Sequence, residues 1–380
     1  MSLKILQTSD WHMDSPFEAL PSSKAATRRA ELRELPGKVA RLAVKEKVDM
    51  VLLPGDLLDS ESFFCETGEE LFRVLRNLPI PVFIAPGNHD YYSGKSPYSK
   101  ARLPSNICVF TRPEIEFFDF SELGFRVFGA AFTDKSSPPI LKKFKVEKTE
   151  GVMDIMCVHG DIVTGDAESS KYNPVTLKQI AESGMDYIAL GHVHSCSGLK
   201  RSGNTFYSYS GCPEGRGFDE TGGKTVNIVE LSAPESPDGA ANCSLRTVPV
   251  CSRTYECVEI DVTDRDPLLA IQMELPDETI RDVYRIVLRG ETDSPVDVGA
   301  LYANLSQYFF ELDIRNGTTL RRDIWEKAGD GTLRGLFLSK MRVLYEEAAD
   351  EGARLKVEQA VRWGLAALDN REEVVRHENF

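Results

Sequence analysis

Short apolar segments that lead directly into polar clusters are the feature that most restricts how this chain can fold. Five such segments occur, at residues 4–7, 49–53, 81–86, 151–158 and 186–190. Apolar runs of this length, bounded by turn-forming residues, predict buried strands. Polar residues follow where each strand would end, and they include five of the six histidines of the chain.

Segments with helical periodicity separate these strands. Apolar residues recur at helical spacing from about residue 25 to 47, where Pro36-Gly37 predicts a break into two helices. Residues 66–77 and 175–183 predict further helices. Alternating strands and helices are typical of a parallel sheet with helical crossovers. Ligand sites in such sheets lie at the carboxyl ends of the strands, where the polar clusters of this chain stand.

The remainder of the chain predicts two further parts. Residues 232–242, rich in proline, alanine and serine, are typical of a hairpin loop near the end of the first domain. Residues 255–316 alternate between strand and helix patterns, and from residue 318 the pattern is helical. We therefore expect a large α/β domain over residues 1–252, a small α/β domain over 253–317 and a helical segment over 318–380.

The composition excludes several classes of protein. A formal net charge of −14 makes the chain too acidic to wrap nucleic acid by general attraction, so a DNA contact would be local, metal-mediated or helped by a partner. The sequence has neither a signal peptide nor an apolar run of the roughly 18 residues that a membrane span needs. Its eight cysteines form no CxxC pair, which favours reduced thiols and a cytoplasmic location.

The polar clusters carry a set of metal ligands. Asp10 and His12 follow the first strand, Asp56 follows the second, and Asn88 follows the third. The last two strands end in histidines: His159, His192 and His194. Carboxylate, amide and imidazole ligands without a thiolate suit Mn, Fe(II), Zn, Co or Ni better than Ca, Mg or an iron–sulfur cluster. A lone histidine is more often structural, but five at strand ends favour metal binding.

The number of ligands points to two metal ions. Seven are too many for one tetrahedral zinc ion, but they suit two ions about 3.5–4 Å apart that share a bridging carboxylate and hydroxide. The spacing of Asp10 and His12 predicts that both point the same way from an extended strand end, and His192 and His194 repeat it. Such a centre hydrolyses phosphate esters, and the sequence has no G-x-S-x-G motif or P-loop.

Taken in order, the clusters resemble the motifs of the calcineurin-like metallophosphoesterases. The matching blocks are Asp10-x-His12, Gly55-Asp56-x-x-Asp59, Gly87-Asn88-His89-Asp90, His159-Gly160 and Gly191-His192-x-His194. The resemblance implies an α/β fold, a two-sheet sandwich with four layers, α/β/β/α, and the site at the strand ends. A small C-terminal α/β cap domain and terminal helices would complete the chain.

The same resemblance implies how the side chains divide their roles. One metal ion would take Asp10, His12, Asp56 and His194. The other would take Asp56, Asn88, His159 and His192, so that Asp56 bridges the two. His89 would act as general acid or transition-state stabiliser, and Asp59 would orient it. Mn²⁺ is the expected metal, with Fe²⁺, Zn²⁺, Co²⁺ or Ni²⁺ as alternatives.

Within the family, the chain resembles the SbcD-type DNA-repair exonucleases and their YhaO-like relatives. The resemblance rests on residues 8–17 and 55–60, on the loop Gly211–Glu220, and on the order of the domains. Ser60 and Asp90 replace an arginine and a glutamate of the serine/threonine protein phosphatases, which argues against that branch. This branch implies single- or double-stranded DNA as substrate, a homodimer, and C-terminal helices that dock on an SMC-like coiled-coil ATPase.

The sequence therefore predicts a dinuclear-metal phosphodiesterase, a DNA exonuclease or endonuclease of DNA repair. A metal-bridging hydroxide would attack the phosphate while His89 stabilises or protonates the leaving oxygen. Arg216, between two glycines, is a candidate for binding the phosphate. The alternative is a phosphodiesterase or phosphatase for a small nucleotide-like substrate. A non-catalytic scaffold would be expected to lose ligands, and all seven are present.

Overall fold

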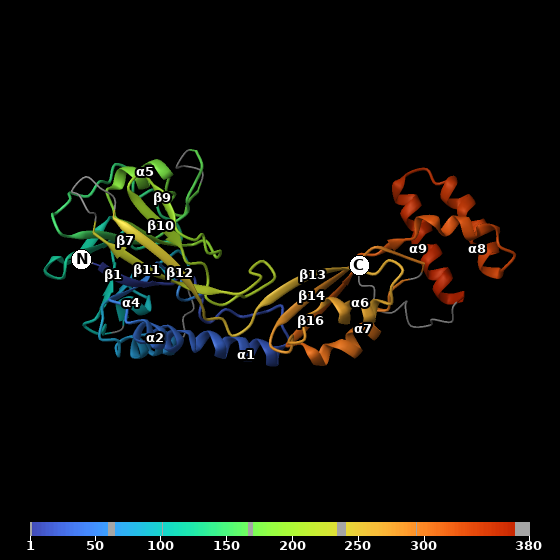
Figure 1. The fold of residues 1–380 in the computed structure, drawn as a ribbon, viewed down its shortest axis with the longest axis horizontal. Helices are drawn as coiled ribbons and strands as arrows, with labels where there is room; N and C mark the ends of the chain where they lie inside the picture. The colour runs from blue at the N-terminus through green and yellow to red at the C-terminus, as the bar shows by residue number, and fades with distance from the viewer. Residues whose placement is uncertain are drawn as a thin grey trace. The chain divides into compact units, whose positions relative to one another are not determined.

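The computed structural model describes residues 2–59, 65–100, 102–165, 170–233, 241–293 and 295–368. They form two compact units, Met1–Thr254 and Tyr255–Phe380 (Figure 1). The expected boundary after residue 252 lies two residues before this division, and a further division at residue 317 stays a prediction. Ser60, His377 and most of the expected hairpin loop at 232–242 lie outside the described residues.

Two six-stranded sheets form the first unit. One has the order β12-β11-β1-β2-β3-β4, and the other β5-β6-β7-β8-β10-β9. The strands of the first sheet are β1 (Ser2–Gln7), β2 (Met50–Leu53), β3 (Val82–Ile84), β4 (Ile107–Val109), β11 (Thr225–Ser232) and β12 (Asn242–Pro249). Those of the second are β5 (Glu116–Phe120), β6 (Phe125–Gly129), β7 (Met153–His159), β8 (Tyr187–Gly191), β9 (Lys200–Ser202) and β10 (Thr205–Tyr209).

The central strands of each sheet run parallel. β1, β2, β3 and β4 pair in parallel, as do β6, β7, β8 and β10, and the antiparallel strands lie at the edges. The carboxyl ends of β1, β2 and β3 therefore share one edge of the first sheet, and those of β7 and β8 share one edge of the second. The five loops that carry the expected ligands leave from these five strand ends.

The layers follow from the alternation of side chains along each strand. In β2, Met50 and Leu52 pack in a core between the two sheets, whereas Val51 and Leu53 pack in a core with the helices. These helices are α1 (Ser22–Arg33), α2 (Leu35–Glu46) and α3 (Cys65–Leu75). On the second sheet, Met156 packs in a third core that includes Ile180 of α5 (Leu177–Ser183). The expected four-layer α/β/β/α sandwich is confirmed.

The break between α1 and α2 differs from the expectation. It falls at Glu34, two residues before Pro36. Pro36 instead stands in the first turn of α2, where the absent N–H has no helical partner to lose. One helical turn, α4 (Pro97–Lys100), lies between β3 and β4. The cysteines for which the structure describes a side chain are free thiols.

The second unit contains the expected small α/β module. β13 (Tyr255–Asp261), β14 (Val283–Arg289) and β16 (Glu311–Asn316) form a parallel sheet that shares a core with α6 (Pro267–Glu274) and α7 (Val298–Leu305). A short pair, β15 (Glu291–Thr292) and β17 (Thr319–Leu320), precedes a 3₁₀ segment at Arg322–Gly329. The helices α8 (Leu333–Glu346) and α9 (Glu351–Leu368) follow. β17 lies in a segment where only helix was expected.

Among the described residues, no helix combines the length and the apolar character that crossing a membrane requires.

Candidate metal centre

Loops from five strand ends meet at one place in the first unit. The loop after β1 supplies Asp10 and His12, and the loop after β2 supplies Asp56 and Asp59. Asn88 and His89 follow β3, His159 ends β7, and His192 and His194 follow β8. In the described part of the chain, the side chains close enough to hold a metal fall into three overlapping groups: Asp10–His12–His194, His12–Asp56–His89 and Asp56–His159–His192.

The backbone of these loops is not extended. Beyond the end of β1, the loop stays paired with the loop after β2, because Asp10 N donates to Gly55 O at 3.0 Å and His12 N donates to Asp56 O at 3.0 Å. The φ angles of Asp10, His12 and Asp56 are 56°, 45° and 52°. The expected strand-like alternation of Asp10 and His12 is therefore wrong. A left-handed backbone conformation is rare outside glycine, and at these two residues it turns both side chains into the site.

Two buried carboxylates are held in place by backbone donors. His192 N donates to Asp10 Oδ1 at 3.0 Å, and His89 N donates to Asp56 Oδ1 at 2.9 Å. Asp10 is 0% exposed and Asp56 is 2% exposed. Burial raises the pKa of both carboxyl groups. Two carboxylates buried this close together need a compensating positive charge, and a bound cation would supply it.

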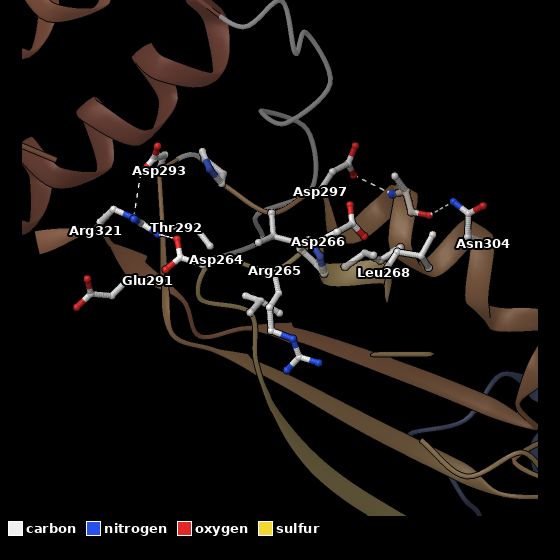
Figure 2. A pocket seen from close by; sticks show the side chains of 16 residues that line it. Asp264, Arg265, Asp266, Leu268, Glu291, Thr292, Asp293, Asp297, Asn304 and Arg321 are labelled. Carbon is white, nitrogen blue, oxygen red and sulfur yellow. Dashed lines mark hydrogen bonds and ion pairs between the residues drawn. The ribbon is translucent and has the colours of Figure 1, made fainter. Parts of the chain in front are cut away.

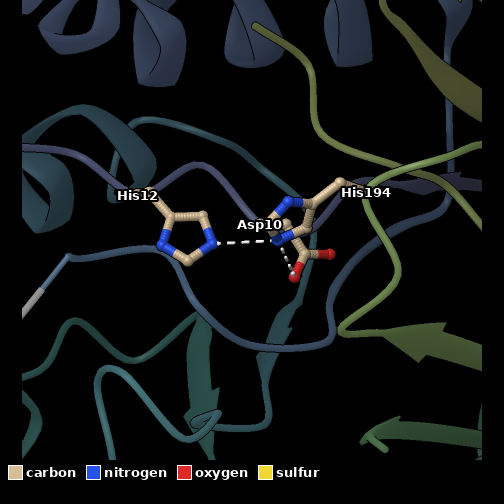
Figure 3. A group of neighbouring side chains, drawn as sticks. All are labelled: Asp10, His12 and His194. Carbon is tan, nitrogen blue, oxygen red and sulfur yellow. Dashed lines mark hydrogen bonds and ion pairs between the residues drawn. The ribbon is translucent and has the colours of Figure 1, made fainter. Parts of the chain in front are cut away.

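One half of the centre consists of Asp10, His12 and His194 (Figure 3). His12 Nδ1 lies 3.3 Å from Asp59 Oδ1, and His194 Nδ1 lies 2.7 Å from Glu220 Oε1. A carboxylate only accepts hydrogen bonds, so each Nδ1 carries the hydrogen and each Nε2 presents a lone pair.

Those two lone pairs face each other. His12 Nε2 lies 3.3 Å from His194 Nε2, and His194 Nε2 lies 3.8 Å from Asp10 Oδ1 (Figure 3). With both hydrogens on Nδ1, no proton is left between the two Nε2 atoms. Two acceptors and a carboxylate that converge without a donor fit a metal ion. Burial also lowers the pKa of His12 to about 3, which keeps the imidazole in the neutral form that a metal requires.

The other half of the centre consists of Asp56, Asn88, His159 and His192. His159 Nδ1 donates to Pro54 O at 3.0 Å, so its Nε2 presents the lone pair. That Nε2 lies 3.4 Å from Asp56 Oδ2 and 3.0 Å from Asn88 Oδ1. The ring of His192 packs 5.1 Å from the ring of His159, and burial lowers its pKa to about 3. The lone pair of His159 Nε2 and the oxygens of Asp56 and Asn88 also converge without a proton between them, so they fit a second metal ion.

His89 differs from the other histidines of the site. Its side chain is 43% exposed, whereas those of His12 and His159 are 1% and 0% exposed. Its Nδ1 lies 3.0 Å from Asp59 Oδ1, and this hydrogen bond raises the pKa of His89. Nδ1 is thus engaged, and Nε2 is left to meet a substrate. The Asp59 carboxylate also contacts His12, which is an expected metal ligand. The sequence analysis had predicted only its contact with His89.

Asp90 ties the second and third loops together. The buried carboxylate accepts hydrogen bonds from Leu57 N at 2.8 Å, Gly87 N at 2.7 Å and Tyr98 Oη at 2.5 Å. The Asp56 carboxylate approaches Gly87 so closely that a Cβ added at Gly87 would lie 2.2 Å from Asp56 Oδ1. Asp90 and Gly87 therefore fix where Asp56 stands.

Arg216 lies beside the centre, but its guanidinium is not free. Its Nη2 donates to Glu220 Oε1 at 2.7 Å and lies 3.1 Å from His194 Nδ1. The flanking glycines gave no sign of these contacts. A contact between Arg216 and phosphate stays a prediction. Glu220 was missed as a site residue. The available signal was an acidic residue four positions after Arg216 in the loop that follows the last two ligands.

A cavity of about 440 Å³ lies in the second unit, beside the starts of α6 and α7 (Figure 2). The carboxylates of Asp266 and Asp297 line it, but they accept hydrogen bonds from Leu269 N at 3.0 Å and Ala300 N at 2.8 Å. They cap the two helices. The carboxylate of Asp293 is paired with Lys327 at 2.9 Å. These acidic groups serve the fold, and none of the three metal-binding groups lies here.

Comparison with known proteins agrees with this geometry. The sequence pattern of the family described as Calcineurin-like phosphoesterase matches residues 3–196, just over half of the 380 residues. The matched segment carries all seven expected metal ligands, together with His89 and Asp59.

The individual relatives share only a modest fraction of identical residues with this chain. The chain is 28% identical over 239 residues to the uncharacterized metallophosphoesterase YhaO of Bacillus subtilis, covering 60% of this chain and 58% of YhaO. It is 22% identical over 306 residues to the DNA double-strand break repair protein Mre11 of Saccharolobus solfataricus, covering 76% of each. A solved dimetal phosphatase from Danio rerio is 12% identical with a TM-score of 0.39, covering 65% of this chain and 98% of that chain.

Proposed function

This chain belongs to the calcineurin-like phosphoesterase family, and on that basis we propose that it is a dinuclear-metal phosphodiesterase that cleaves DNA. The observation that carries the proposal is the convergence of unprotonated Nε2 atoms and buried carboxylates. His12 and His194 face each other at 3.3 Å, and His159 faces Asn88 at 3.0 Å, without a donor between either pair. Two divalent ions, Mn²⁺ in our proposal, would satisfy all of these groups.

The two halves of the centre would each hold one ion, with Asp56 between them. His12 Nε2 and His159 Nε2 lie 3.8 Å and 3.4 Å from Asp56 Oδ2, so this oxygen is within reach of both halves. When bound, two such ions lower the pKa of a water and neutralise charge on a phosphoryl group. The residues that hold them do so through neutral imidazoles and ionised carboxylates.

His89 would supply the proton for the leaving oxygen. Asp59 accepts a hydrogen bond from His89 Nδ1 at 3.0 Å and raises the pKa of His89, which favours the imidazolium form. In that form the exposed ring also carries an Nε2–H, which would face the leaving oxygen. Hydrolysis adds one water to the phosphodiester, breaks one P–O bond, and releases a phosphomonoester and an alcohol. A donor at the leaving oxygen contributes typically 10²–10⁴-fold in rate. Ser15 Oγ donates to Asp59 Oδ2 at 2.5 Å and keeps this carboxylate in place.

The choice of DNA as the substrate rests on similarity. Mre11 of Saccharolobus solfataricus is named as a DNA double-strand break repair protein, and 76% of this chain aligns with it. For this chain we propose exonuclease or endonuclease cleavage of single- or double-stranded DNA, with the small domain of the second unit as a cap over the substrate.

A second candidate is a phosphodiesterase or phosphatase for a small nucleotide-like substrate. The formal net charge of −14 favours it, because an acidic protein repels a long polyanion more than a small one.

One experiment separates the two candidates. The protein, loaded with Mn²⁺, is assayed on single- and double-stranded DNA, on bis-p-nitrophenyl phosphate and on nucleotides. Cleavage of DNA with release of nucleotides or short fragments supports the nuclease. Cleavage of the small esters alone would replace it with the second candidate.

We also propose a homodimer that binds an SMC-like coiled-coil ATPase through its C-terminal helices. α8 exposes apolar side chains, among them Leu333 (70%), Leu336 (56%) and Leu344 (52%), while Leu338 is buried. Exposed apolar residues on a helix are typical of a partner surface. Light scattering would measure the oligomeric state, and co-purification with such an ATPase would be lost when these leucines are changed to serine. A cytoplasmic location would follow from that partnership.

A further inference from the structure

We propose that Glu220 is a positioning residue of the metal centre, which fixes His194 for metal binding, and that α1 holds the loop that carries Glu220. The inference rests on the proposed function and deepens it, because it names residues beyond the seven ligands on which one metal ion depends. The loop is defined here as the Glu220 loop, Ser210–Glu220, which follows β10 in the first unit.

The contact between Glu220 and His194 determines which nitrogen faces the metal. Glu220 is 4% exposed, and its Oε1 lies 2.7 Å from His194 Nδ1. An ionised carboxylate can only accept, and its 2.7 Å contact is shorter than the 3.1 Å between Arg216 Nη2 and the same Nδ1. The imidazole hydrogen therefore stays on Nδ1, and the lone pair stays on Nε2. Nε2 is the atom that faces His12 and Asp10. Without Glu220, the hydrogen could move to Nε2 and block the metal.

Arg216 holds the Glu220 carboxylate at both oxygens. Its backbone N donates to Oε2 at 2.8 Å, and its guanidinium Nη2 donates to Oε1 at 2.7 Å. The positive guanidinium offsets the negative charge of Glu220, so the pair adds orientation to His194 with little net charge. This pairing explains why the buried carboxylate of Glu220 is tolerated next to a centre that already contains the carboxylates of Asp10 and Asp56.

The Glu220 loop is attached to α1 by a buried ion pair. Arg28 of α1 is 0% exposed, and its Nη2 donates to Glu214 Oε2 at 3.0 Å and to Gly215 O at 2.8 Å. Glu214 is 1% exposed and also accepts from Lys38 Nζ at 3.1 Å. Desolvating such a pair is costly, so it contributes little to stability compared with apolar packing. Its effect is to fix the backbone next to Arg216.

The other end of the loop is fixed by backbone contacts to the His194 segment. Cys212 N donates to His194 O at 3.1 Å. Gly211 has a φ of +72°, and a Cβ there would lie 2.9 Å from His194 O. The loop is therefore held at His194 and at α1, and Glu220 reaches His194 Nδ1 from a fixed position.

The test compares Mn²⁺ binding by the wild-type chain, Glu220→Gln and Glu220→Ala, with Glu182→Gln as the matched control. Glu182 lies on α5, is 62% exposed and pairs only loosely with Lys178 at 3.8 Å. Free Mn²⁺ is measured by electron paramagnetic resonance during titration, and ¹⁵N shifts of the metal-free protein report the tautomer of each histidine. Thermal unfolding shows whether each variant is folded.

We expect the wild type and Glu182→Gln to bind two ions alike. In Glu220→Ala, one of the two sites should weaken about 10–100-fold while the other keeps its affinity, and His194 should lose its single Nδ1–H tautomer. Glu220→Gln keeps the volume and should weaken the same site, because the amide NH2 must replace one of two acceptors and would meet either Arg216 N–H or His194 Nδ1–H. If Glu220→Ala fails to fold, the glutamine variant decides.

Three results would overturn the inference in distinguishable ways. Two sites of unchanged affinity in a folded Glu220→Gln, with His194 still a single Nδ1–H tautomer, would show that Glu220 does not position His194. A wild-type chain that binds no Mn²⁺ would instead remove the proposed function itself. Equal weakening of both sites, with an earlier unfolding transition, would assign Glu220 a general structural role and also reject the proposal.

Discussion

The two halves of the candidate metal centre are built by different means. In the half with His12 and His194, each Nδ1 is held by a side-chain carboxylate, from Asp59 or Glu220. In the other half, His159 Nδ1 is held by the backbone carbonyl of Pro54. A carboxylate can be removed by substitution, and a backbone carbonyl cannot. The first half should therefore be weakened by changes outside the metal ligands, whereas the second half should depend on its ligands and on the close packing of its loops.

The largest effect should come from the one residue within reach of both halves. Asp56→Ala is expected to prevent the binding of a metal pair and to lower phosphodiesterase activity at least about 1,000-fold, or about 4 kcal/mol in barrier. Elemental analysis and turnover of bis-p-nitrophenyl phosphate measure both effects. An Asp56→Ala protein that still held two ions would contradict the bridging position.

His89 belongs to neither half, so its removal should separate binding from turnover. His89→Ala is expected to retain both metal ions and to lose about 10²–10⁴-fold in activity, because the proton donor for the leaving oxygen is absent. The check is turnover of a fully metal-loaded variant. Activity near that of the wild type in such a protein would reject the role assigned to His89, and loss of one ion would make His89 a ligand.

A crowded glycine tests the packing of the second half. A Cβ at Gly87 would lie 2.2 Å from Asp56 Oδ1, so Gly87→Ala must move that carboxylate. A displacement of about 1 Å near the reacting groups can cost about 100-fold in rate. Gly94→Ala is the matched control, because nothing lies within 4 Å of its added Cβ. Equal rates for the two variants would mean that Asp56 is not positioned by this contact.

The first half is tested through Asp59. Asp59→Asn should weaken the metal site of His12 about 10–100-fold and leave the site of His159 unchanged, because this carboxylate contacts His12 and His89 but belongs to the first half of the centre. Titration with Mn²⁺ followed by electron paramagnetic resonance resolves the two affinities. A parallel weakening of both sites would abolish the distinction between the halves.

The last prediction concerns stability rather than activity or affinity. Removing the metal with a chelator should lower the melting temperature of the first unit, since the ligands converge only in the folded chain. At a metal concentration 100 times Kd, each ion adds about 2.7 kcal/mol, which corresponds to several degrees for a domain of this size. Calorimetry with and without Mn²⁺ measures the shift. A Glu182→Gln control should show the same shift, and an absent shift in the wild type would indicate that the ions do not bind.

Much of the site follows from the sequence because its signal is local. Each strand is a short apolar run, and each ligand stands within a few residues of the end of that run, so the strand order was not needed to group Asp10, Asp56 and Asn88. The backbone between strand and ligand was not predictable in this way. Left-handed φ angles at Asp10 and His12 arise because two loops pair with each other, which only the folded chain reveals.

The sequence analysis also did not predict the residues that affect the site by holding another residue in place. Glu220 and His194 are 26 positions apart, and Arg28 reaches Glu214 across 186 positions. Neither pair belongs to a spaced motif. A glutamate in a glycine-rich loop is exposed in most proteins, and it is buried here because Arg216 and His194 take up its hydrogen bonds. Such contacts depend on how the loops close over the strand ends.

The most direct measurement is the number of metal ions per chain after loading with Mn²⁺ and removal of excess metal. The opposed lone pairs of His12 and His194, and of His159 and Asn88, predict two ions per chain. They also predict that Asp56→Ala fails to retain the pair while His89→Ala retains it. A wild-type chain that holds one ion or none would contradict the dinuclear centre.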